Sequence, residues 1–179
     1  MLQKSNLWNT VALFFINPTK EQYLMEMSRE INLAHTSLKK NLIELVKQGI
    51  VKETLQKKRG RIFPLYKADL DSKEYRKYKK IYNITSLLES GLVEFIEDRL
   101  MPTAIVVFGS YQKGEDTEES DIDIFVGCKR DELDVARFEK TLRRKIQFHF
   151  NENFSAFPKE LKNNIINGVV LAGFLEGYR

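Results

Sequence analysis

The stretch VVFGSYQKGEDTEESDIDIFV, residues 106–126, decides how the second half of this chain folds. It begins apolar, turns at Gly109-Ser110, crosses an acidic loop and ends in an alternating pattern that predicts a strand. Because residues i and i+2 of a strand point to the same side, Asp121 and Asp123 should project together while their apolar neighbours project into a core. The stretch therefore predicts two strands, with a Gly-Ser turn facing a pair of carboxylates.

Two carboxylates side by side repel each other, and burying them without a partner is costly. A divalent cation between Asp121 and Asp123 would explain the pair, since Mg²⁺ binds one or two protein carboxylates together with substrate phosphate oxygens. Gly109 would let backbone approach a phosphate closely, and Ser110 and Lys113 would supply donors to it. The alternative from these residues alone is a solvated edge strand beside an ordinary turn.

The spacing of these groups makes a larger pattern. GSYQKG at residues 109–114 is followed, after five residues, by SDID at residues 120–123. This order resembles the minimal nucleotidyltransferases of the DNA polymerase beta superfamily, whose signature runs Gly-Ser-x-x-Arg-Gly and then Ser-Asp-x-Asp. The resemblance covers about residues 101–173.

The resemblance implies an activity and a set of site residues. Asp121 and Asp123 would be catalytic and would hold Mg²⁺ or Mn²⁺, and a nucleoside monophosphate would pass from a triphosphate, expected to be ATP, to an acceptor. The nucleotide-binding residues that it implies are Gly109, Ser110, Lys113 and Ser120. The acceptor stays open between a protein, a small molecule and a nucleic-acid end, and a toxin partner is one protein candidate.

The sequence departs from this family pattern at two places. Lys113 stands where many relatives have arginine, and lysine meets phosphate as a point charge rather than bidentately. The third carboxylate is expected on the strand 145–150, but its outward residues are not acidic. Gln147 aligns best with the missing acid, and His149 or Glu152 could replace it. A nucleotidyltransferase and a transcriptional regulator whose degenerate domain only binds or senses nucleotide therefore both stay open.

The first half predicts a different module. Helical patterns cover residues 6–17, 19–31 and 34–48, and a hairpin follows with strands at 50–55 and 62–66 around a basic tip. Pro64 indicates an edge strand. This order resembles the winged helix-turn-helix DNA-binding domains of archaeal and bacterial regulators, over about residues 6–68.

Positive charge is concentrated in this part of the chain, because residues 1–68 carry 12 Lys/Arg against 5 Asp/Glu. An excess of positive charge favours a polyanionic partner. The resemblance to winged-helix domains implies that this partner is double-stranded DNA and that the protein is a homodimer. A winged helix used only for protein contacts is the alternative. The expected DNA-binding residues are His35, Thr36, Ser37, Lys39 and Lys40 on the third helix and Lys57, Lys58, Arg59 and Arg61 at the hairpin tip.

We expect an α+β chain with three parts: a winged helix domain at 1–68, a helical connector at 69–100, and a small α/β nucleotidyltransferase-like domain with a mixed sheet at 101–179. In the last part we expect strands at 103–108, 121–126 and 145–150, a helix at 131–144, a helix opened by Pro158 and a short apolar element at 169–171.

Gross composition excludes several other classes of protein. The chain of 179 residues has one cysteine and two histidines, which rules out an intrachain disulfide and makes a zinc site improbable. Its apolar runs are too short to span a bilayer, and the N-terminus lacks the pattern of a secretory signal. We therefore expect a cytoplasmic protein with no membrane partner.

Overall fold

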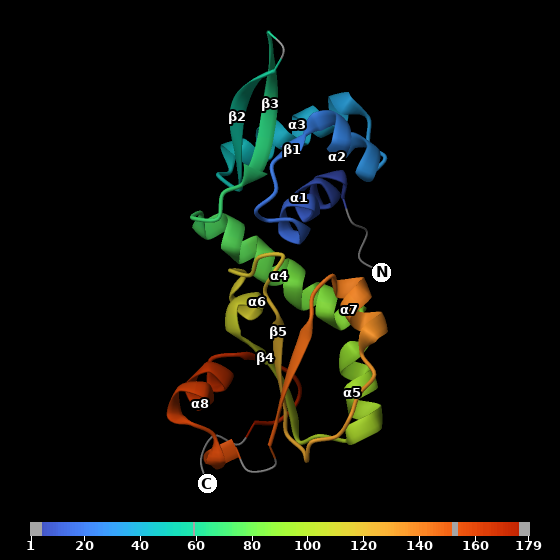
Figure 1. Ribbon diagram of the computed structural model, residues 1–179, viewed down its shortest axis with the longest axis vertical. Coiled ribbons are helices and arrows are strands. Elements are labelled where there is room, and N and C mark those ends of the chain that lie inside the picture. Colours follow the sequence, from blue (N-terminus) through green and yellow to red (C-terminus); the bar gives the residue numbers. More distant parts are fainter. Residues whose placement is uncertain (1–4, 59, 152–153, 176–179) are drawn as a thin grey trace. The chain divides into compact units, whose positions relative to one another are not determined.

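The computed structural model describes residues 5–58, 60–151 and 154–175. The chain divides into two compact units, residues 1–79 and 80–179, and the boundary falls inside helix α4 (Lys73–Glu89). Each unit has its own sheet (Figure 1). We call them unit 1 and unit 2.

Unit 1 packs helices against an antiparallel sheet with the strand order β1-β3-β2. The elements are α1 (Asn6–Ile16), β1 (Gln22–Tyr23), α2 (Leu24–Glu30), α3 (His35–Lys47), β2 (Val51–Lys58) and β3 (Arg61–Ala68). Ser5 caps α1 by accepting a hydrogen bond from the Trp8 N–H, and the helix ends before Pro18, as predicted. Leu38, Leu42 and Leu45 form the buried stripe of α3.

The helix predicted at 19–31 is wrong at its start. Gln22 and Tyr23 are extended because they pair with Tyr66 and Leu65 of β3, and α2 begins only after them. Tertiary pairing overrides the local helical pattern here.

The hairpin is longer than the sequence predicts, because β2 and β3 pair as far as Lys58 and Arg61. Pro64 indicates an edge strand, and this prediction is correct only for the part of β3 around Pro64. β3 is the middle strand of its sheet, but β1 pairs with it only beyond Pro64, so the missing N–H of the proline costs no hydrogen bond to β1.

Unit 2 is built on a mixed sheet with the order β6-β5-β4-β7, in which β5 and β6 are parallel and the other pairs antiparallel. This confirms the predicted mixed sheet. Its elements after α4 are α5 (Leu92–Leu100), β4 (Ala104–Phe108), α6 (Gly109–Lys113), β5 (Ile122–Val126), α7 (Ala136–Leu142), β6 (Ile146–Phe150), the 3-10 turn η1 (Phe154–Ala156), α8 (Lys159–Ile166) and β7 (Val169–Gly173).

Helices cover both faces of this sheet, with α8 on one side and α5 and α7 on the other (Figure 1). Strand β5 shows why: Ile122, Ile124 and Val126 pack with α4, α5 and α7, whereas Phe125 packs with Ile165 of α8 on the opposite face. A strand buried on both faces is mostly apolar, and the two aspartates lie at its start, Asp121 just before β5 and Asp123 as its second residue.

The helix predicted at 131–144 is confirmed only as α7. Asp131 Oδ1 accepts a hydrogen bond from the Glu132 N–H, and Asp134 Oδ1 accepts one from the Ala136 N–H. These local bonds offer the backbone an alternative to helix before residue 136. Two candidate residues, Arg59 and Glu152, lie outside the described residues. No helix in the described part of the chain is long and apolar enough to cross a membrane.

Candidate functional site

The turn after β4 packs directly on a carboxylate. Phe108, the last residue of β4, pairs with Asp123 of β5, and Gly109 follows at a φ of +77°. A Cβ on Gly109 would lie 2.6 Å from Asp123 Oδ2. Two features therefore favour glycine at position 109: the left-handed backbone and the close approach of the carboxylate.

Asp121 and Asp123 have different surroundings. Asp123 is half-buried, on the same face of the strand as Phe125, while Asp121 lies one residue before β5 and is exposed. Within the described ranges Asp121 makes no hydrogen bond or ion pair. It is thus the more accessible of the two carboxylates, and Asp123 is the more firmly held.

The contact to Asp123 from β6 comes from His149. Its Nε2 lies 3.1 Å from Asp123 Oδ1, and its ring centroid lies 5.1 Å from that of Phe108. Gln147 is the register partner of Asp123 on β6 but is exposed. Alternation along the strand does place His149 on the same face as Gln147, but nothing in the sequence shows that its side chain reaches Asp123.

The predicted phosphate-binding residues surround the same turn. Ser110 is half-buried in the first turn of α6, and Lys113 is exposed at the end of that helix. The Ser120 hydroxyl accepts a hydrogen bond from the Thr117 N–H at 2.9 Å, so it closes the turn that leads into Asp121.

A buried polar cluster fixes the loop between α6 and β5. Asp116 is 1% exposed, and its Oδ1 accepts a hydrogen bond of 2.7 Å from Asn83 Nδ2 on α4. Its Oδ2 lies 3.3 Å from Arg144 Nη2, just before β6. Asn83 also donates to the Tyr111 carbonyl at 2.8 Å. We call Asn83, Asp116 and Arg144 the loop anchor.

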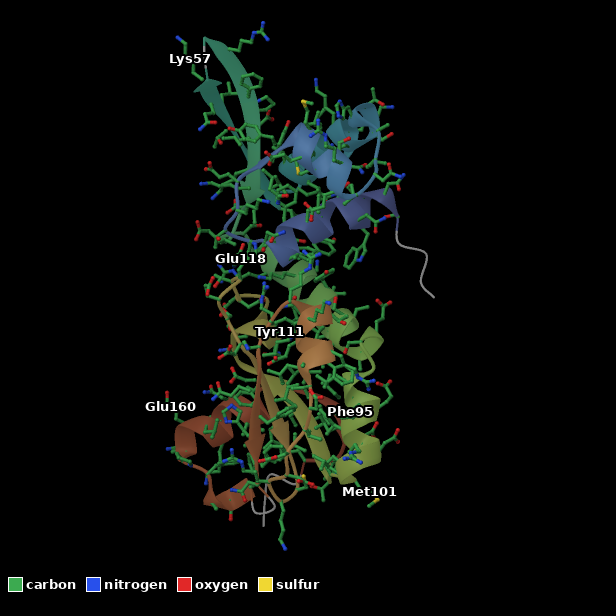
Figure 2. All side chains as sticks on the ribbon, turned by 45° about the vertical axis from the view of Figure 1, so that its right-hand side comes forward. Lys57, Phe95, Met101, Tyr111, Glu118 and Glu160 are labelled. Carbon is green, nitrogen blue, oxygen red and sulfur yellow. The ribbon has the colours of Figure 1, made fainter. Side chains whose placement is uncertain are left out.

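Tyr111, labelled in Figure 2, contacts this anchor through its hydrogen bonds with Asn83. Its hydroxyl donates to the Asn83 carbonyl at 3.4 Å. Burial, and after it the negative charge of Asp116, raise the pKa of the Tyr111 hydroxyl above its ordinary value, so it stays a neutral donor. Sequence reasoning missed the loop anchor, because Asp116 is one of several acidic residues in the loop and only burial distinguishes it.

The donor set at the turn fits a cation bound together with phosphate. Two carboxylates, Asp121 and Asp123, are what Mg²⁺ takes from a protein when phosphate and water fill the remaining positions. Among the described residues no group of three or more His, Cys, Asp or Glu side chains is arranged to hold a metal ion. Asp121 and Asp123 by themselves suit a cation whose remaining ligands are phosphate and water oxygens.

The residues predicted to bind DNA are spread over α3 and the hairpin of unit 1. His35, Thr36, Lys39 and Lys40 are exposed and Ser37 is half-buried. Lys57 lies on the outer part of the hairpin (Figure 2), and Arg61 opens β3 and is exposed. The Arg59 position and the side chain of Lys58 fall outside what the structure describes.

Comparison with known proteins bears mainly on unit 2. Residues 91–173 match the family described as "Polymerase beta, Nucleotidyltransferase", so this segment is a nucleotidyltransferase-family domain, as its motif predicts. A solved structure described as a "possible transcriptional regulator", from Methanosarcina mazei Go1, is similar at 17% identity and a TM-score of 0.37, covering 52% of this chain and 76% of that one. No curated protein matches the sequence.

Proposed function

We propose that the domain at residues 91–173 transfers a nucleoside monophosphate from a nucleoside triphosphate, with ATP the expected donor, to an acceptor hydroxyl. The observation that carries this proposal is the packing of Gly109 on Asp123, where a Cβ would lie 2.6 Å from Oδ2. A turn with no side chain against a half-buried carboxylate is the arrangement that a cation–phosphate group would need on entering the site.

The side chains at this turn have different roles in the proposed reaction. Asp121 and Asp123 hold Mg²⁺ or Mn²⁺, which when bound supplies charge neutralisation to the phosphates. Ser110 offers a hydroxyl, and Lys113 an exposed ammonium that meets phosphate as a point charge. Ser120 acts indirectly, because its hydroxyl already closes the turn that presents Asp121.

One observation favours a second candidate function. The β6 position in register with Asp123 is Gln147, and the β6 side chain that contacts Asp123 is His149, so no carboxylate of β6 faces the site. A missing general base can lower the rate of a chemical step by about 10²–10⁴. Nucleotide binding needs fewer groups than transfer, and a domain that senses nucleotide in a transcriptional regulator is therefore the alternative.

We further propose that unit 1 is a winged helix that binds double-stranded DNA. Support comes from the order of its elements, from the exposed side chains of His35, Lys39 and Lys40 on α3, and from the basic hairpin. In this proposal α3 lies in the major groove and Lys57 and Arg61 meet the backbone. We also propose that unit 1 binds DNA as a homodimer. For the transfer reaction, a protein such as a toxin is one candidate acceptor.

The transfer is tested with a nucleoside triphosphate labelled on the α-phosphate, Mg²⁺ and cell extract as the source of acceptor. Transfer should be lost in the Asp121→Asn/Asp123→Asn variant and kept in Glu119→Gln, which removes an exposed carboxylate from the same loop. Because the γ-phosphate leaves in pyrophosphate, γ-label on the acceptor should be no higher than with the Asp121→Asn/Asp123→Asn variant. Metal-dependent nucleotide binding without transfer would overturn the enzyme and leave the sensor.

A further inference from the structure

The two oxygens of Asp123 have different neighbours. Oδ1 lies 3.1 Å from His149 Nε2, and Oδ2 is the atom nearest to the space beside Gly109. The side chains of His149 and Asp123 are 19% and 27% exposed, so the contact lies partly out of water. One oxygen is thus held by the protein, while the other borders the turn assigned to phosphate.

Strand register alone does not produce this contact. On β6, His149 pairs with Phe125, while Asp123 pairs with Gln147. The imidazole must therefore lean along the strand to reach Asp123. The Phe108 ring, 5.1 Å away between centroids and inclined by 58°, packs against the imidazole from β4. His149 is therefore held against Asp123 by a neighbour on the far side of β5.

We infer that His149 is a positioning residue for Asp123: it donates its Nε2–H to Oδ1 and thereby keeps Oδ2 turned to the Gly109 side for the cation. The inference rests on the proposed function, since it assumes that Asp123 binds a cation. In this inference β6 supplies a hydrogen-bond donor where the family pattern has a third carboxylate, and the role of this donor is to orient Asp123.

This role predicts a defined effect on metal affinity. Hydrogen-bond partners of metal ligands typically contribute about 10–100-fold to affinity, because they fix the orientation of the ligand. His149→Ala should therefore weaken Mn²⁺ binding by about tenfold or more. His149→Gln keeps an amide N–H at a similar reach and should retain most of the affinity.

The experiment is a Mn²⁺ titration of the full chain, followed by electron paramagnetic resonance of free Mn²⁺, with and without a non-hydrolysable ATP analogue. The variants are His149→Ala, His149→Gln and Asp123→Asn, each checked by circular dichroism for a native fold. Asn164→Ala is the control, since it truncates an exposed polar side chain of α8 in the same unit, outside the candidate site.

The inference stands if His149→Ala binds Mn²⁺ about tenfold more weakly while His149→Gln and Asn164→Ala bind like the native chain. It is overturned if Asp123→Asn weakens binding but His149→Ala does not, or if His149→Gln falls together with His149→Ala. Unchanged Mn²⁺ binding in Asp123→Asn would instead overturn the cation assignment of the proposed function. The two failures therefore give different results.

Discussion

Gly109 opens α6 and Asp123 lies on β5, yet the space that a side chain on Gly109 would need is taken by the Asp123 carboxylate. A Cβ at residue 109 would lie 2.6 Å from Oδ2, which leaves no room for a methyl group unless Asp123 moves. At a φ of +77° the backbone also disfavours any residue with a Cβ. A single position thus couples the shape of the turn to the orientation of the proposed cation ligand.

Gly109→Ala should therefore abolish metal-dependent nucleotide binding as well as lower stability. The left-handed backbone alone costs about 1–2 kcal/mol for a residue with a Cβ. Gly91 is the matched control, because it has the same φ of +77° and a Cβ there would meet nothing within 4 Å. Calorimetric nucleotide titrations and thermal melts of both variants separate the two effects. Equal nucleotide affinity in the two variants would contradict the role given to the Gly109–Asp123 contact.

The loop anchor predicts a large stability effect away from the turn itself. Asp116→Asn keeps an acceptor for Asn83 but removes the negative charge that lies 3.3 Å from the Arg144 guanidinium, whose side chain is 5% exposed. Breaking a buried ion pair in this way costs about 3–5 kcal/mol. Denaturant unfolding followed by circular dichroism measures it. The control Glu74→Gln breaks the exposed pair with Lys77 and should cost less than about 1 kcal/mol. Similar losses in both variants would contradict the structural role of Asp116.

Much of this fold can be predicted from sequence because strong local patterns coincide with burial. The leucine stripe of α3 and the alternation of β5 each identify their element, and the predicted mixed sheet is confirmed. Local patterns fail where pairing with a distant strand determines the backbone conformation. Gln22 and Tyr23 continue a helical pattern but pair with β3 instead, and that strand lies far along the chain, at Leu65 and Tyr66.

The candidate site likewise contains residues that local sequence predicts and residues that only the structure reveals. The motif alone predicts Gly109, Asp121 and Asp123 as candidates, because its spacing is a local property of the chain. The contact of His149 with Asp123 depends on the tilt of a side chain across two parallel strands, which residue order does not encode. Asp116 is likewise identified only by the burial that Asn83 and Arg144 provide.

The proposed DNA contacts of the hairpin predict a change in salt dependence. Each lysine or arginine that meets a phosphate contributes about one unit to the slope of log affinity against log salt. Lys57→Ala/Arg61→Ala should therefore make the slope shallower by about two units and weaken binding of all duplexes alike. Fluorescence anisotropy of a labelled duplex over a salt series measures this, with Lys20→Ala, exposed elsewhere in unit 1, as the control. An unchanged slope in the double variant would contradict the hairpin assignment.

The position of Gln147 allows a gain-of-function prediction. It is exposed and in register with Asp123, so an acid there would stand beside the proposed cation. Gln147→Asp should tighten Mn²⁺ binding and raise nucleotidyl transfer, because a positioned base contributes about 10²–10⁴ to such a step. The uncharged variant Gln147→Asn controls for the shortened side chain, and an exposed substitution should change stability by less than about 0.5 kcal/mol. Label transfer from the α-phosphate under single-turnover conditions is the measurement. Tighter Mn²⁺ binding with no gain in transfer would show that the absent carboxylate does not limit the reaction, and would favour a domain that only senses nucleotide.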